Sequence, residues 1–158
     1  MVIHPIPPVY DKNSKVLVLG SFPSVKSREE GFFYGHPANR FWKVLSAVMG
    51  RNEPVSTEEK RELLLESGIA VWDVIASCEI VGSSDSSIKN ACPNDIGIIL
   101  KNTKVNRIFV NGKTAKKYYD KYLLPLIKID AVCLPSTSPA NAVYTLDRLI
   151  KEWAIIRE

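Results

Sequence analysis

Four short β-rich segments alternate with helical patterns along this chain, and the alternation limits the possible folds more than any other feature. The segments span Lys15 to Gly20, Ile69 to Val74, Arg107 to Val110 and Ile129 to Leu134. The first segment, KVLVLG, is continuously apolar, as is typical of a parallel strand buried on both faces. Strands separated by helices favour an α/β fold. We therefore expect a three-layer α/β sandwich in which helices flank a central, mainly parallel four-stranded sheet.

Apolar residues at helical spacing predict the intervening helices. Phe41, Val44, Leu45 and Val48 share one face of a helix from Arg40 to Met49, with Asn39 well placed as its N-cap. The remaining helices are expected at Thr57 to Ser67, from Asn94 or Asp95 to Lys101, from Asn111-Gly112 to about Tyr122, and after Pro139 with a stripe from Ala142 to Trp153. Residues 79–93 are polar and irregular, so a surface loop is expected there.

Length and composition limit the class of protein. The 158 residues suit one domain (1–158), with Pro5, Pro7 and Pro8 making residues 1–14 an extended lead-in. The net charge of +4 permits binding to a polyanion without demonstrating it. We find no apolar run of the roughly 20 residues that a membrane helix needs. We expect a monomer as the default.

The three cysteines lie far apart and form no CxxC pair, so zinc and iron–sulfur sites are disfavoured. Their odd number and the lack of a signal peptide favour a reducing cytoplasm. No GxGxxG or P-loop sequence follows the first segment, which disfavours nucleotide cofactors. We therefore expect neither a metal nor a cofactor.

The unusual sequence lies where an open α/β sheet binds ligands, in the loops that follow the carboxyl ends of strands. These loops are residues 21–39, Asn111-Gly112, and residues 135–141. Phe32, Phe33 and Tyr34 in the first loop either provide a face on which a base stacks or simply cover the sheet.

Each polar side chain in these loops has two possible roles, one functional and one structural. His36 and Asn39 are candidates for catalysis, although structural roles are the more common ones for lone His and Asn. The Asn111 amide suits a base edge or an Asn-Gly turn. Short hydroxyl side chains and lysines contact phosphates, or they cap a helix and face solvent. The candidate phosphate contacts are Ser136, Thr137, Ser138 and Lys113.

These loops resemble motifs of the uracil-DNA glycosylase superfamily. Gly35 to Trp42 (GHPANRFW) is similar to the HPANRFW segment of mismatch-specific uracil/thymine-DNA glycosylases. Gly20 to Ser24 matches their Gly-x-x-Pro turn, and Leu134 to Ser136 their Pro-Ser loop. One position differs: Phe22 stands where that branch has an Asn that helps position the attacking water. Gly20 to Pro23, Tyr34 to Trp42 and Leu134 to Asn141 instead resemble the hypoxanthine-DNA (deoxyinosine) glycosylase branch most.

The resemblance implies a monofunctional DNA glycosylase that removes a deaminated base from double-stranded DNA. It makes Asn39 the leading catalytic residue, with His36 beside it. It gives Tyr34 the base-stacking place and makes Ser21 and Phe22 the pocket floor, while Asn111 would read the base edge. Because no carboxylate lies between Tyr34 and Asn39 or in the third loop to act as a strong base, we expect electrostatic and positional catalysis. The alternatives are a mismatch-specific uracil-DNA glycosylase, a non-catalytic DNA-lesion-binding module, and a small-molecule hydrolase.

Overall fold

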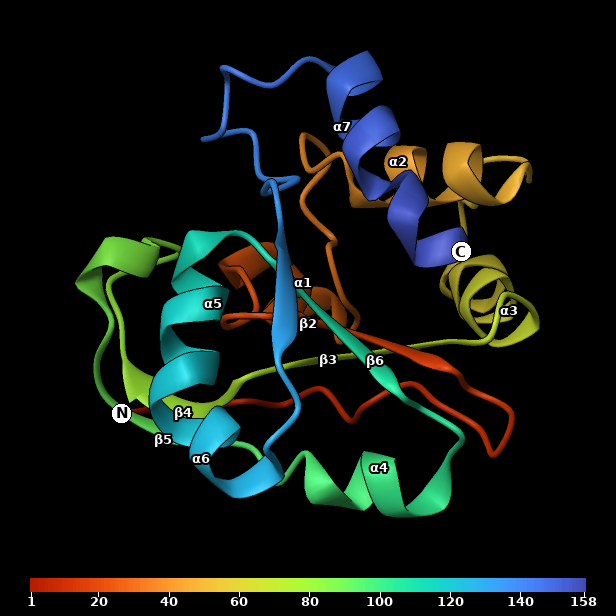
Figure 1. Cartoon of the computed structure of the whole chain (residues 1–158). Helices are drawn as coiled ribbons and strands as arrows, with labels where there is room; N and C mark the ends of the chain where they lie inside the picture. Colours follow the sequence, from red (N-terminus) through yellow and green to blue (C-terminus); the bar gives the residue numbers. More distant parts are fainter.

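The centre of the molecule is a four-stranded sheet in which every neighbouring pair is parallel (Figure 1). The computed structural model describes residues 1–158. The strands, in the sheet order β3-β2-β6-β7, are β3 (Ile69–Asp73), β2 (Val16–Gly20), β6 (Arg107–Asn111) and β7 (Ala131–Leu134). All five residues of β2 are buried, as the continuous apolar segment predicts for an interior strand.

Alternate residues of the sheet face two separate hydrophobic clusters. Val16 and Val18 pack with the helices of one face, whereas Leu17 and Leu19 pack with those of the other. The helices of the first face are α2 (Phe41–Met49), α3 (Thr57–Glu66) and α7 (Leu146–Trp153), which continues into η3 (Ala154–Arg157). Those of the second are α4 (Gly97–Asn102), α5 (Lys113–Tyr118) and α6 (Leu124–Ile127), with α5 and α6 joined by the π-helical turn η2 (Tyr119–Leu123). The predicted three-layer α/β sandwich is therefore confirmed.

A second, antiparallel sheet was not predicted. It has the order β1-β4-β5 and consists of β1 (Val2–Ile3), β4 (Ile75–Glu79) and β5 (Lys89–Pro93), with the short turn η1 (Asp85–Ser87) before β5. The expected loop at residues 79–93 is thus wrong for the residues of β5. That strand is KNACP, with four of its five residues exposed, so its sequence carries no alternating apolar pattern. Residues 1–14, expected as an extended lead-in, also take part in strand pairing, because β1 pairs with β4 and Val9 forms a bridge with Val71.

Several helices differ from the expectation. The short helix α1 (Val25–Glu30) was missed because it buries only Ser27. The N-cap of α2 is Arg40 rather than Asn39, although the Asn39 side chain still accepts a hydrogen bond from the next turn. The last helix begins at Leu146 instead of just after Pro139, since Thr145 caps it. None of the helices is long and apolar enough to cross a membrane.

Candidate active site

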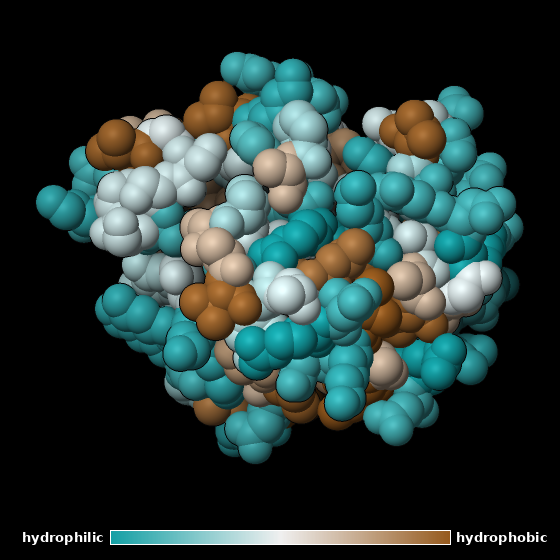
Figure 2. Space-filling model, turned by 90° about the horizontal axis from the view of Figure 1, so that it is seen from above, coloured by the Kyte–Doolittle hydropathy of each residue, from teal (hydrophilic) through white to brown (hydrophobic).

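A cavity of about 1070 Å³ opens at the carboxyl ends of the parallel strands. Its walls come from the turn after β2, the η1 segment, the start of α5 and the loop after β7, with residues contributed from 20–39, 83–86, 111–114 and 133–144. The loop after β7 lies at the top of the molecule in Figure 1, and Figure 2 looks down on that side. Most of the surface seen there is hydrophilic or near neutral, with isolated hydrophobic groups, as suits a polar ligand. All ten residues to which the sequence analysis gave a catalytic, base-binding or phosphate-binding role line this cavity.

The Asn39 amide has a fixed orientation. Its Oδ1 accepts from the backbone N–H of Phe41 (2.9 Å) and from the hydroxyl of Thr137 (2.9 Å). Because a backbone N–H can only donate, Oδ1 must be the atom on that side. The Nδ2 group, which makes no hydrogen bond within the protein, is therefore left for the cavity that Asn39 lines. Asn39 presents hydrogen-bond donors to a ligand, and its acceptor is already occupied.

Thr137 is the centre of a buried network rather than a surface contact. Its side chain is fully buried, so it is not available to a DNA strand. Besides donating to Asn39, its Oγ1 accepts from Asn111 Nδ2 (3.0 Å), and its backbone N–H donates to Asn111 Oδ1 (3.0 Å). Its carbonyl accepts from the backbone N–H of Arg40 (3.0 Å). Both polar ends of Asn111 therefore hold Thr137, which leaves one Nδ2 hydrogen for a base edge.

Arg40 fixes the loop that contains Ser136 and Ser138. The sequence analysis did not single out this arginine. Its guanidinium donates to the carbonyls of Ser138 (2.9 Å), Asn141 (3.1 Å) and Tyr144. With the loop fixed in this way, the half-buried Ser136 and Ser138 stay at the cavity wall. The exposed Lys113, the first residue of α5, lies on the same wall.

The aromatic run divides into core and site. Phe32 and Phe33 are 4% and 2% exposed and belong to the core cluster under α2, which favours the sheet-covering reading for these two rings. Tyr34 lines the cavity with one face stacked on Phe41 (ring centroids 4.0 Å apart). Its φ of +52° is uncommon for a bulky residue, and such strain is found mainly where a site demands it.

His36 is exposed at the mouth of the cavity. Its Nδ1 accepts from the backbone N–H of Ala38 (3.1 Å). That hydrogen bond leaves Nε2 as the protonated nitrogen of the neutral ring, so His36 presents a donor outward. This arrangement suits contact with a phosphate or with the leaving base.

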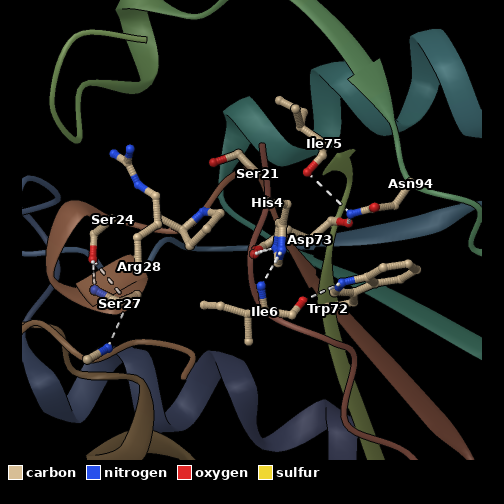
Figure 3. Close-up of polar contacts among 12 residues, drawn as sticks. His4, Ile6, Ser21, Ser24, Ser27, Arg28, Trp72, Asp73, Ile75 and Asn94 are labelled. Atoms are coloured by element: carbon tan, nitrogen blue, oxygen red, sulfur yellow. Dashed lines mark hydrogen bonds and ion pairs between the residues drawn. The ribbon is translucent and has the colours of Figure 1, made fainter. Parts of the chain in front are cut away.

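Two carboxylates reach the cavity from segments outside the expected loops. Asp85 in η1 accepts from the Ser21 hydroxyl with both oxygens (3.1 Å each). Burial of this carboxyl raises its pKa, the Ser21 hydrogen bond opposes the rise, and the charge of Asp73 adds to it. Asp73, the last residue of β3, is 3% exposed and bonds His4 of the N-terminal segment (Figure 3). The sequence analysis considered only the first and third loops and therefore missed these two carboxylates.

Ser21 and Phe22 are both 8% exposed and line the cavity. The Phe22 ring packs against Arg28, whose guanidinium carbon lies 5.6 Å from the ring centroid. No group of three or more His, Cys, Asp and Glu side chains is arranged to hold a metal ion.

A parallel α/β sandwich with a polar cavity at the carboxyl ends of its strands, walled by the Pro-Ser loop and the segment ending in Asn39, is the arrangement expected of a base-excising enzyme. The family model of the uracil DNA glycosylase superfamily matches residues 7–157. The chain belongs to this superfamily, and the family predicted from the motif loops is confirmed.

Two curated relatives and one solved structure are similar to this chain over most of its length. A hypoxanthine DNA glycosylase of Methanosarcina acetivorans is 33% identical over 158 residues, covering 99% of this chain and 98% of the relative. A hypoxanthine DNA glycosylase of Methanosarcina barkeri is 33% identical over 138 residues, 85% of each chain. The solution NMR structure of an M. acetivorans protein proposed to be a uracil DNA glycosylase superposes with a TM-score of 0.83 at 32% identity, covering 99% of this chain and 97% of that one.

Proposed function

We propose that this protein is a monofunctional DNA glycosylase that excises hypoxanthine from double-stranded DNA. Excision requires that the damaged nucleotide leave the base stack, which costs a few kcal/mol. Tyr34, which packs face to face on Phe41 and lines the cavity, provides an aromatic wall against which the edge of the extruded base is held. Ser136, Ser138 and Lys113 lie where the DNA backbone on either side of the lesion would pass.

The single observation that carries the proposal is the fixed Asn39 amide. Cleavage of the N-glycosidic bond leaves negative charge on the departing base and positive charge on the sugar, as in other glycosyl transfers. Asn39 Nδ2 presents donors to the cavity without having to reorient, because Phe41 and Thr137 hold its oxygen. A preorganised donor of this kind stabilises a developing anion.

The remaining groups complete the hydrolysis. The negative charge of the cavity carboxylate Asp85 favours the sugar cation. A water molecule adds hydroxide to the sugar carbon, and its proton passes to the base, so an abasic site and free hypoxanthine result. His36 Nε2–H is available to the leaving base or to a phosphate. Weakly paired lesions are extruded most easily, which adds selectivity.

The test is base release from duplex oligonucleotides that contain one deoxyinosine or one deoxyuridine, with Asn39→Asp alongside the wild type. Aspartate keeps both acceptor bonds of Asn39 but replaces the donor with negative charge. Loss of one such donor slows catalysis by about 100- to 1000-fold in other enzymes, and we expect a fall of at least this size. Asn106→Asp, which makes the same charge change at an exposed position far from the cavity, is the matched control and should act like the wild type.

The other outcomes separate the alternatives. Release of uracil alone would keep the superfamily but replace the substrate by that of a mismatch-specific uracil-DNA glycosylase. Binding of deoxyinosine DNA without release would indicate a lesion-binding module. Absence of any affinity for DNA would indicate a small-molecule hydrolase.

A further inference from the structure

The cavity contains a hydrogen-bond acceptor that comes from none of the three loops singled out in the sequence. Asp73 ends β3, and its carboxylate Oδ2 accepts from His4 Nε2 at 2.7 Å (Figure 3). The backbone carbonyl of Asp73 accepts from Asn94 Nδ2 (2.9 Å), so the main chain is held as well. The side chains of His4 and Asp73 are 3% and 5% exposed. The pair is thus a fixed, nearly dry unit at the edge of the cavity.

The hydrogen bonds of His4 determine which partner donates. Its Nδ1 accepts from the backbone N–H of Ile6 (3.2 Å), so the ring proton is on Nε2 and points to Asp73. The ring is enclosed by three aromatic side chains, Phe22, Phe33 and Trp72, at centroid distances of 5.8, 6.1 and 6.3 Å. It cannot turn without disturbing this packing. His4 therefore fixes Oδ2 as an occupied acceptor.

The other carboxylate oxygen is free. Asp73 Oδ1 makes no hydrogen bond within the protein, and Asp73 lines the cavity. Beside it lies the Tyr34 hydroxyl, which is buried and has no hydrogen-bond partner. A Cβ added at Gly20 would lie 2.4 Å from Oδ1 and 3.0 Å from this hydroxyl, so the glycine leaves both groups open to the same small space.

The hydroxyl is a donor at every physiological pH. Burial raises the pKa of Tyr34 far above its ordinary value, and the charge of Asp73 raises it further. The floor therefore offers a negative acceptor next to a neutral donor, and neither makes a hydrogen bond of normal geometry within the protein, while the nearby Asn111 amide opposes part of the rise in the pKa of Tyr34. Leaving such buried groups unpaired is costly, so a ligand that satisfies both is strongly favoured.

We propose that Asp73, positioned by His4, accepts a hydrogen bond from the ring N–H of an extruded base, while the Tyr34 hydroxyl donates to the adjacent carbonyl oxygen. This inference rests on the proposed function and names the chemical feature of its substrate, a lactam edge. Deamination of adenine creates that edge: N1 changes from an acceptor to N–H, and the amino group becomes a carbonyl. Adenine would direct the N1 lone pair at the carboxylate. Sites built around a hydrogen bond reject ligands that lack it by factors as large as about 10⁴.

Asp73→Asn tests the assignment because His4 determines how the new amide lies. The His4 Nε2–H can only donate, so the Asn oxygen must occupy the Oδ2 position and the NH₂ group must replace Oδ1. The acceptor that faces the base becomes a donor. We expect hypoxanthine release to fall by about 100-fold or more, and the ratio of adenine to hypoxanthine release, measured with matched oligonucleotides, to rise at least tenfold.

Two comparisons isolate the effect. Asp85→Asn changes the other carboxylate of the cavity and should keep the adenine-to-hypoxanthine ratio of the wild type, whatever its rate. His4→Ala in the Asp73→Asn background removes the donor that fixes the amide, so the amide can turn over and hypoxanthine release should partly recover. Circular dichroism and thermal unfolding verify that each variant is folded.

A substrate change covers the case in which Asp73→Asn does not fold. The wild-type enzyme is assayed on DNA containing 1-methylhypoxanthine, whose methyl group replaces the N1 hydrogen, and release should fall by at least 100-fold. Normal release of this base, or a wild-type ratio in Asp73→Asn, would overturn the role of Asp73 while hypoxanthine excision stands. Absence of base release by the wild-type protein from any duplex would overturn the proposed function itself.

Discussion

The hydroxyl of Thr137 joins the two amides of the site, and Thr137→Val removes it while keeping the shape of the side chain. Thr137 is fully buried. Its Oγ1 donates to Asn39 (2.9 Å) and accepts from Asn111 (3.0 Å), and both bonds are lost in the variant. The backbone bonds of Thr137 to Asn111 and Arg40 remain. The variant therefore loosens Asn39 without dismantling the loop.

The loss can be estimated from these two bonds. Each contributes about 0.5–1.5 kcal/mol to folding, so the free energy of unfolding should fall by about 2 kcal/mol. For a chain of this size, 1 kcal/mol lowers Tm by about 2–4 °C, which predicts a decrease of about 4–8 °C. Asn39 keeps only its Phe41 anchor, so its donor is less well oriented and single-turnover base release should slow by at least about tenfold.

The assay combines thermal unfolding followed by circular dichroism with single-turnover release from deoxyinosine DNA. Thr137→Ser is the matched control, because it keeps the hydroxyl and loses one buried methyl group, worth about 1 kcal/mol. Thr137→Ser should be less stable than the wild type but close to it in rate. If both variants lose rate equally, or if Thr137→Val releases base at the wild-type rate, the hydroxyl does not position Asn39.

Three further predictions concern the backbone, a titrating group and the chemistry. Gly112 has φ +98°, and a Cβ at this position would lie 3.0 Å from Ser136 Cβ. Gly112→Ala should therefore lower the urea midpoint of unfolding by the equivalent of about 1–3 kcal/mol. A midpoint equal to that of the wild type would show that the turn tolerates a side chain. Burial raises the pKa of Asp85, so this carboxyl holds its proton more tightly in the folded than in the unfolded chain and its contribution to stability falls as pH rises through the raised value. Asp85→Asn should flatten that fall when urea unfolding is followed upward from about pH 4, the ordinary pKa of an aspartate, and an unchanged slope would contradict the assignment. No lysine lies in the motif segments Gly20 to Ser24, Tyr34 to Trp42 or Leu134 to Asn141, so borohydride should trap no covalent adduct with DNA, whereas a trapped species on a denaturing gel would indicate lyase activity.

The central sheet was predictable because buried parallel strands are marked by continuous apolar runs. β2 and β6 appear at their expected residues to within one position. The capping box of α3 was equally visible, since Ser56 and Glu59 are local in sequence and make both expected bonds. In contrast, β4 and β5 form an irregular, largely solvent-facing pair, and neither has a pattern that a single sequence reveals.

The site was predictable in outline only. The loops that line it follow from the rule that ligands bind at the carboxyl ends of parallel strands. The roles within the loops depend on contacts between distant residues: Asn111 and Thr137 are 26 positions apart, and Arg40 reaches Tyr144 across 104. The cavity carboxylates were missed for the same reason, because Asp73 and Asp85 lie in segments that show no motif of their own.

The position of His4 has a practical consequence. It lies directly after the two-residue strand β1, near the start of the chain, and bonds Asp73, which is 69 positions away in the sequence. Proteolytic trimming or a badly placed fusion tag at that end would leave the main sheet and both motif loops in place, and the product would pass as native by size and secondary structure. The discrimination between hypoxanthine and adenine would change although the fold would not. Preparations meant for measuring base preference therefore need an intact amino terminus without a fused tag.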